Sequence, residues 1–187
     1  MARPAENLEG YLISRCLSQD RQAQRELYRL YADAMFAVCL RLMKDRDAAQ
    51  DALQEAFVDA FTRLDSFRGE ASFGSWLKRI VIHRCLAELK KQQRLDFIQT
   101  TDQLPQPSEE PDQTHPDDDW DYEIKRIKAA IAELPDGART VLTLYLLEGY
   151  SHQEIADILS ITNATSKAQY SKAKKRLRQL LRTSAIS

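Results

Sequence analysis

The sequence predicts an all-α protein of two small helical domains joined by a flexible acidic linker, with a helix-turn-helix in the second domain. Its 187 residues include only 5 glycines and 6 prolines, and 43% of them are hydrophobic, so helices with apolar faces can account for most of the chain. Residues 1–94 contain 16 lysines and arginines and 13 acidic residues. Residues 95–121 contain 9 acidic residues and no lysine or arginine, and residues 122–187 contain 11 lysines and arginines and 6 acidic residues. This asymmetry indicates two folded parts that can approach nucleic acid, with an acidic segment between them.

The spacing of apolar residues predicts three helices before residue 65. The first covers about residues 8–17 and the second covers residues 21–43. The residues of the second helix that we expect to face inward are Leu27, Leu30, Tyr31, Ala34, Met35, Val38 and Leu42. A third helix begins near Asp45, ends near Leu64 and turns Asp51, Gln54 and Glu55 toward a polar face. Such a face is most often simply exposed to water.

A loop between residues 65 and 75 precedes a basic helix. Two glycines and several polar residues interrupt the helical pattern there, and the next helix covers residues 75–94. Its basic side chains are Lys78, Arg79, His83, Arg84, Lys90, Lys91 and Arg94. Aromatic residues beside basic ones are typical of a site for single-stranded nucleic acid, where bases stack and phosphates are neutralised. Alternatively Phe67, Phe73 and Trp76 belong to the core, an interpretation that the sequence favours for at least Trp76.

The acidic segment at residues 95–121 contains four prolines, nine acids and no lysine or arginine. This composition predicts an extended or disordered linker that could span up to about 90 Å. The run of acids at residues 117–119 lacks the converging geometry of a magnesium site, so we expect no metal and no cofactor.

The cysteines and the hydropathy pattern bear on compartment. Cys16, Cys39 and Cys85 are widely separated and form no CxxC pair, which favours three buried thiols over a disulfide framework or a zinc site. The chain has no apolar run of about 18 residues and no secretory pattern at its N-terminus. We therefore expect a cytoplasmic protein without membrane insertion.

The second domain is expected to contain four helices. Residues 122–134 and 138–148 form the first two, separated by a turn at Pro135. Gly149 then ends the second helix, and Ser151 with Glu154 three residues later has the spacing of a capping box for a short helix to Leu159. After an interruption at residues 160–162, Thr162 is a suitable N-cap for the last helix. Two short-linked helices of this kind form a helix-turn-helix.

The last helix is expected to have an inward stripe and a basic outer face. The inward stripe is Ser166, Tyr170, Ala173, Leu177 and Leu181. The opposite face carries Lys167, Ala168, Ser171, Lys172 and Lys175. A helix-turn-helix places its second helix in the major groove of DNA, where small and basic side chains reach bases and phosphates. The alternative is an exposed lysine-rich helix without a partner.

Several strings in this order and spacing resemble the extracytoplasmic-function (ECF) sigma factors of bacterial RNA polymerase. They are DRDAAQDALQEAF at residues 45–57, FRG at 67–69, SFGSWLKRI at 72–80, LP at 134–135 and LLEGYSHQEIA at 146–156. Each string alone is weak, but their order and spacing together are specific. The resemblance covers nearly all of the chain from Leu27 to Leu181.

The resemblance implies a role for each part of the chain. Residues 1–94 would be sigma region 2, residues 95–121 a linker toward the RNA path, and residues 122–187 sigma region 4. Core RNA polymerase would bind Asp51, Gln54 and Glu55. The residues implied for the minus-ten element of promoter DNA are Phe67, Arg68, Phe73, Lys78, Arg79 and His83. The residues implied for the minus-thirty-five element are Thr165, Lys167, Ala168, Ser171, Lys172 and Lys175. Members of the family are often held inactive by an anti-sigma protein, so such a partner is expected, and no small-molecule substrate is.

The chain departs from the family pattern at several positions. Relatives usually carry Asn at the position of His83 and Asp at that of Ala87. Ser160 replaces the usual Gly of the turn. Asn163 and Ser166 stand where Val is usual, so two apolar groups are lost at the junction of the turn and the last helix. These changes predict a less rigid reading domain or an altered promoter preference.

Two other classes of protein compete with a sigma factor. A stand-alone helix-turn-helix regulator would explain the last helix but not the polar face with Asp51 or the basic helix after the loop. A nucleic-acid enzyme would need converging catalytic groups, whereas His83, His115 and His152 are scattered over three segments. The sequence therefore favours a sigma factor that is not an enzyme.

Overall fold

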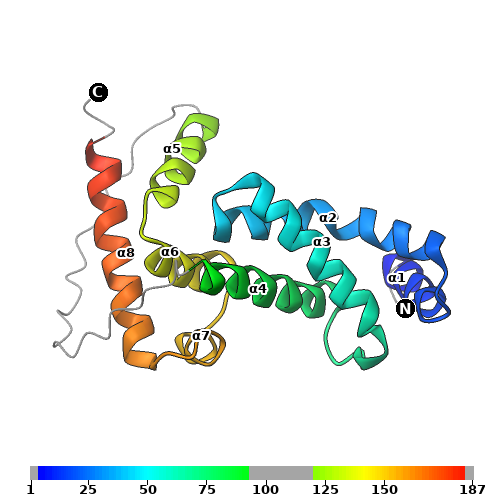
Figure 1. The fold of residues 1–187 in the computed structure, drawn as a ribbon. Helices are drawn as coiled ribbons and strands as arrows, with labels where there is room; N and C mark the ends of the chain where they lie inside the picture. Colours follow the sequence, from blue (N-terminus) through cyan, green and yellow to red (C-terminus); the bar gives the residue numbers. More distant parts are fainter. Residues whose placement is uncertain (1–3, 93–119, 184–187) are drawn as a thin grey trace. The chain divides into compact units, whose positions relative to one another are not determined.

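The computed structural model describes residues 4–92 and 120–183, and within these ranges every regular element is helical (Figure 1). The predicted all-α class is confirmed. The chain divides into two compact units, Met1–Gln92 and Gln93–Ser187, each of which is treated by itself. Residues 95–119 of the predicted linker lie outside the described residues. No helix within the two described ranges is both long and apolar enough to cross a membrane.

Unit 1 is built from four α-helices and one short 3-10 turn. These are α1 (Pro4–Leu17), α2 (Arg21–Met43), α3 (Arg46–Thr62), η1 (Leu64–Ser66) and α4 (Phe73–Lys91). Helices α2, α3 and α4 pack against one another, and α1 packs against α2. Side chains of Asp20, Asp45 and Ser72 accept hydrogen bonds from the first N–H groups of α2, α3 and α4. Helices α2, α3 and α4 thus each begin after a good N-cap residue.

The buried side of α2 differs from the predicted stripe. Leu30 is 55% exposed and Ala34 is also exposed, so both predictions were wrong. Burial instead moves around the helix, from Leu27 near its start to Cys39 and Met43 near its end. Packed helices cross at an angle, so the covered face of a 23-residue helix shifts along its length. All three cysteines are free and buried, as the sequence predicted.

Unit 2 contains the helix-turn-helix. Its elements are α5 (Trp120–Ala132), α6 (Asp136–Leu142), η2 (Thr143–Leu147), α7 (His152–Leu159) and α8 (Asn163–Thr183). A core cluster of Leu134, Ala138, Leu142 and Ala173 joins α6 to α8 and the end of α5. Ile124 and Ile127 in the first part of α5 are 44% and 39% exposed, whereas Ile131 near its end packs against this cluster.

The predicted continuous helix at residues 138–148 is wrong in its second half. The α-helix ends at Leu142, and residues 143–147 form a wider π-helical turn. The N–H of Glu148 donates to the carbonyl of Thr143, five residues earlier, at 3.1 Å. A π turn rotates the side chains that follow it relative to an α-helix. Here Tyr145 comes to lie against His152, with ring centroids 4.3 Å apart.

The ends of α7 and α8 agree with the sequence analysis. Ser151 and Glu154 form a complete capping box, and the N–H of Thr165 donates to Oγ1 of Thr162 at 3.0 Å. Gly149 has a positive φ of 78°, which glycine adopts at little cost. Ser160, which follows α7, lies in the left-handed region with φ 57° and ψ 44°.

Candidate nucleic-acid and protein interfaces

The outer face of α3 presents the three residues predicted to bind a protein partner. Asp51, Gln54 and Glu55 are all exposed, and their spacing places them on one side of the helix. The opposite side is buried through Ala52, Leu53, Ala56 and Phe57. The face is therefore available in this unit while the helix itself is anchored by its apolar side.

Arg84 of α4 reaches this face, a contact that sequence reasoning missed. Its Nη1 lies 3.3 Å from a carboxylate oxygen of Glu55, and its Nε donates to Asp59 Oδ2 at 3.1 Å. A second nitrogen of Arg84 also pairs with Asp59. The sequence analysis grouped Arg84 with the basic residues of the helix after the loop, but its guanidinium faces α3. Only the packing of α4 on α3 could show this, since 25 residues separate Arg84 from Asp59.

The loop before α4 ends in a cluster of aromatic rings. Phe73 lies at its centre, with ring centroids 5.3 Å from Tyr31, 5.6 Å from Phe67 and 5.5 Å from Trp76. Phe73 has no exposed surface, whereas Phe67 and Trp76 are half-buried. The predicted contact of Phe73 with DNA stays a prediction; in this structure its ring is buried against the other three. Phe73 is thus the most deeply buried of the three aromatic residues that the sequence offered as core, and Trp76 is only half-buried.

The remaining predicted minus-ten residues surround this cluster and follow along α4. Arg68, Arg79 and His83 are exposed, and Lys78 is half-buried. Gly69 has a φ of 73°, and a Cβ atom on Gly74 would lie 3.0 Å from Tyr31 Cε1. The two glycines therefore let the loop turn and let the start of α4 approach Tyr31 closely. The result is a half-buried aromatic surface beside exposed positive charges, the combination that binds single-stranded nucleic acid.

The exposed face of α8 carries most of the predicted minus-thirty-five residues. Lys167, Ser171, Lys172 and Lys175 are exposed, and Ala168 is half-buried. Thr165 differs, because its side chain is only 7% exposed and its Oγ1 lies 2.8 Å from Oγ1 of Thr162. Its hydroxyl takes part in the N-cap of the helix, and its predicted DNA contact stays a prediction.

The junction between α7 and α8 is polar at Asn163 and Ser166, the two positions where the family pattern has apolar Val. Ser166 is fully buried, and its Oγ lies 2.9 Å from His152 Nδ1. Asn163 Nδ2 donates to Gln153 Oε1 at 3.3 Å. Burial lowers the pKa of His152 below its ordinary value, and the positive charge of Lys167 lowers it further. The two departures from the family pattern thus each supply a bond between the helices.

No group of three or more His, Cys, Asp or Glu side chains within residues 4–92 and 120–183 is placed to hold a metal ion. The surfaces that the geometry does offer are an acidic and polar face on α3, an aromatic and basic surface before α4, and a basic face on α8. These are the surfaces at which the sequence analysis predicted a protein partner and nucleic acid to bind.

Comparison with known proteins assigns each unit. Residues 27–95 match the family model for sigma-70 region 2, and residues 124–177 match that for sigma-70 region 4. The two regions in one chain define a sigma factor of bacterial RNA polymerase. The ECF RNA polymerase sigma-E factor of Haemophilus influenzae is 30% identical over 172 residues, which cover 87% of this chain and 89% of that protein. The ECF sigma factor SigW of Bacillus subtilis is 29% identical, with 87% of this chain and 91% of that protein covered.

The chain belongs to the ECF RNA polymerase sigma factors, and the resemblance found in the sequence is confirmed. It is an alternative sigma factor that directs promoter-specific transcription initiation, and sigma factors regulate transcription rather than catalyse a reaction.

Two solved structures show the same fold. The sigma factor RpoE of Bartonella quintana, solved with the anti-sigma factor NepR, has a TM-score of 0.55 at 24% identity and covers 84% of this chain and 96% of its own. CnrH, solved with the cytosolic domain of CnrY, has a TM-score of 0.54 at 20% identity and covers 94% and 98%.

Proposed function

We propose that the two units divide the work of a sigma factor between core binding with minus-ten recognition in residues 1–94 and minus-thirty-five recognition in residues 122–187. The observation that carries this proposal is the exposed face of α3, with Asp51, Gln54 and Glu55, in the same unit as the aromatic surface before α4. A stand-alone helix-turn-helix regulator would need neither. We place the protein in the cytoplasm because its polymerase works there.

Core polymerase binds the α3 face in this proposal. The three side chains offer two carboxylates and an amide to a basic or polar partner surface. Nη1 of Arg84 lies 3.3 Å from Oε2 of Glu55 and forms an ion pair with it. An arginine with two carboxylate partners restricts the rotamers of both, which lowers the entropy lost when a partner binds. The face is thus partly ordered before core polymerase arrives.

Promoter DNA engages the protein in two chemically different ways. Melted minus-ten DNA stacks against the half-buried rings of Phe67 and Trp76, while Arg68, Arg79 and His83 supply positive charge or hydrogen bonds near its phosphates. Duplex minus-thirty-five DNA meets the exposed face of α8, where Lys172 reaches bases and Lys175, about a turn later, lies over phosphates.

In this proposal the linker at residues 95–121 works through its negative charge and its length rather than through a fixed structure. It carries nine acidic residues and no lysine or arginine, so replacing the acids by amides should change initiation or promoter escape more than DNA affinity. An anti-sigma protein is a further expected partner. The sigma factor RpoE was solved with the anti-sigma factor NepR, and CnrH was solved with the cytosolic domain of CnrY.

Run-off transcription with purified core polymerase tests the assignment. The full chain should direct a promoter-specific transcript that core polymerase alone does not make. Gln54→Ala combined with Glu55→Ala should weaken the binding of core polymerase and leave the helical circular dichroism unchanged. Glu133→Ala, which removes one exposed carboxylate from unit 2, is the matched control and should leave core binding as it was. A folded double variant with unchanged core affinity would remove the role of the α3 face.

A further inference from the structure

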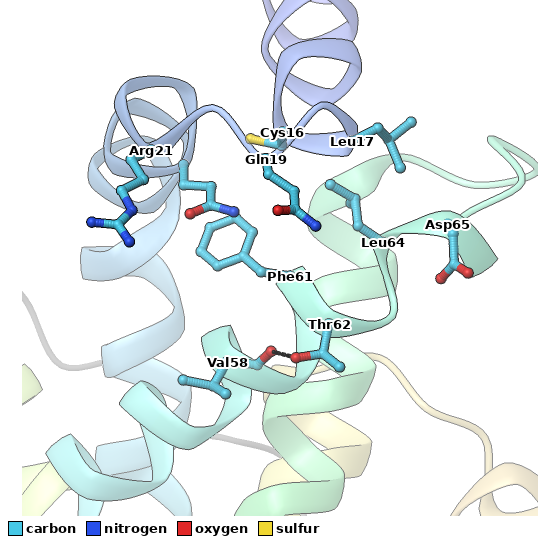
Figure 2. A pocket seen from close by; sticks show the side chains of 10 residues that line it. Cys16, Leu17, Gln19, Arg21, Val58, Phe61, Thr62, Leu64 and Asp65 are labelled. Carbon is cyan, nitrogen blue, oxygen red and sulfur yellow. Dashed lines mark hydrogen bonds between the residues drawn. The ribbon is translucent and has the colours of Figure 1, made fainter.

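Helix α1 meets the segment that leads into the loop before α4. Leu17, the last residue of α1, lines one surface hollow of about 580 Å³ together with Leu64 and Asp65 of η1 (Figure 2). Leu64 is buried, and its carbonyl accepts a hydrogen bond from the N–H of Phe67 at 3.1 Å. The first residues of the loop are therefore packed beside the end of α1, which contacts η1.

The far end of the loop is connected to α1 through Tyr31 of α2. The hydroxyl of Tyr31 donates a hydrogen bond to Oε2 of Glu9, which stands 22 residues earlier in α1. Burial raises the pKa of this hydroxyl, and the hydrogen bond to Glu9 raises that pKa further. The hydroxyl therefore keeps its proton at neutral pH and acts as the donor of the bond.

The ring of Tyr31 lies against the first turn of α4. Its centroid is 5.3 Å from that of Phe73, and the two ring planes are inclined at 60°. A Cβ atom on Gly74 would lie 3.0 Å from Cε1 of Tyr31, so a side chain at this position would crowd the ring. Tyr31 thus borders both the first side chain of α4 and the backbone that follows it.

Phe73 connects Tyr31 to the two half-buried rings of the cluster. Its centroid is 5.6 Å from that of Phe67 and 5.5 Å from that of Trp76, and the latter two centroids are 5.4 Å apart. Phe73 has no exposed surface, and close packing leaves little room for it to shift alone. A displacement of Phe73 therefore moves the rings on which an unpaired base can stack.

We propose that Tyr31, oriented by Glu9, is a positioning residue for recognition of the melted minus-ten element. It holds Phe73 and the start of α4, and so sets the spacing and tilt of Phe67 and Trp76. This inference rests on the proposed role of those two rings in binding minus-ten DNA. Stacking alone tolerates any base, so selectivity for one base requires that the rings be held in a fixed geometry by the residues behind them.

A purely structural role is the alternative, in which the bond between Tyr31 and Glu9 only holds α1 on α2. Tyr28 offers a matched comparison. It lies three residues earlier in α2, and its ring packs on Phe57 of α3 with the centroids 4.6 Å apart. Tyr28→Phe therefore removes the same hydroxyl from the same helix at a different contact.

The test uses holoenzyme assembled from the full chain and core polymerase. Selection from single-stranded DNA randomised over the minus-ten positions gives the preferred oligonucleotide. A second probe carries one change, at the base that the parental holoenzyme selects most strongly. The ratio of the two Kd values measures base discrimination, and a loss of folded protein alone leaves that ratio unchanged because it affects both probes equally.

Tyr31→Phe and Glu9→Ala should each reduce this ratio about threefold to fivefold, because each removes the hydrogen bond that orients the ring. The double variant should lose no more than either single variant, since both act on the same bond. Glu9→Gln keeps an acceptor oxygen and should retain most of the discrimination. Tyr28→Phe should give the parental ratio.

Three outcomes would overturn the inference. If Tyr31→Phe and Glu9→Ala lower the thermal midpoint of unfolding but keep the parental ratio, the bond is structural only. An equal loss of discrimination in Tyr28→Phe would show that the effect does not depend on the cluster. If Phe67→Ala and Trp76→Ala leave the affinity of holoenzyme for both probes unchanged, the proposed role of the rings fails, and the positioning role fails with it.

Discussion

Replacing Ser160 by glycine is expected to stabilise unit 2. Ser160 follows α7 in the left-handed region, and its N–H and that of Ile161 both donate to the carbonyl of Ala156. A residue with a Cβ atom in this conformation costs about 1–2 kcal/mol. Glycine removes that cost but gains about 0.5–1 kcal/mol of conformational entropy in the unfolded chain. The net expected gain is about 0.5–1 kcal/mol in the free energy of unfolding of unit 2.

Thermal and urea unfolding of the full chain measure this gain. A gain of this size corresponds to a rise of about 2–8 °C in the midpoint for a domain of this length. Ser160→Ala is the matched control: it removes the hydroxyl, for which the described residues offer no hydrogen-bond partner, but keeps the Cβ atom, so it should not stabilise. Lys44→Gly, at a φ of 66° after α2, should stabilise unit 1 and leave the unit 2 transition where it was.

A Ser160→Gly variant that unfolds at or below the parental midpoint would refute the reasoning. So would an alanine variant that is as stable as the glycine variant, because the effect would then come from the hydroxyl rather than from backbone strain. Binding to minus-thirty-five duplex should stay close to parental, since the exposed face of α8 is not changed.

Three further predictions concern Arg84, His152 and the lysines of α8. Arg84→Met should lower the free energy of unfolding of unit 1, measured in urea, by about 1–2 kcal/mol because it leaves Asp59 without its partner. If Glu55 shares the interaction, the same substitution should cost less in a Glu55→Gln variant. The lowered pKa of His152 means that the folded state binds a proton less readily than the unfolded state. The stability of unit 2 should therefore be fully present above the ordinary histidine pKa of 6.5 and should fall as the pH drops through and below that value. His152→Gln should flatten this pH dependence, and an unchanged loss of stability at low pH in that variant would assign the loss to another group. Lys172→Ala should reduce the preference for the matched minus-thirty-five duplex over a scrambled one by about 1–3 kcal/mol of binding free energy. Lys175→Ala should weaken binding to both duplexes equally and lower the slope of log affinity against log salt concentration by about one. An equal loss on both duplexes for both variants would show that α8 binds DNA without sequence preference.

The sequence by itself determined where α7 and α8 begin because those signals are local. The capping box of Ser151 and Glu154, the cap at Thr162 and the glycine at residue 149 each act within four residues of the bond that they make. A capping side chain needs only its own turn of helix, so its effect can be read without knowledge of the rest of the molecule. The exposed lysines of α8 follow in the same way from helical periodicity.

The partners of individual side chains were decided by the tertiary structure. Periodicity indicates which side of a helix is apolar, but it does not say where a neighbouring helix crosses, and so Leu30 was expected inside and lies outside. Phe73 is more deeply buried than Trp76 for the same reason, since its ring is the one that packs against Tyr31. Arg84 meets Asp59 across 25 residues of sequence only because α4 packs on α3. Burial and pairing depend on several helices meeting at one place, and no short stretch of the chain contains that information.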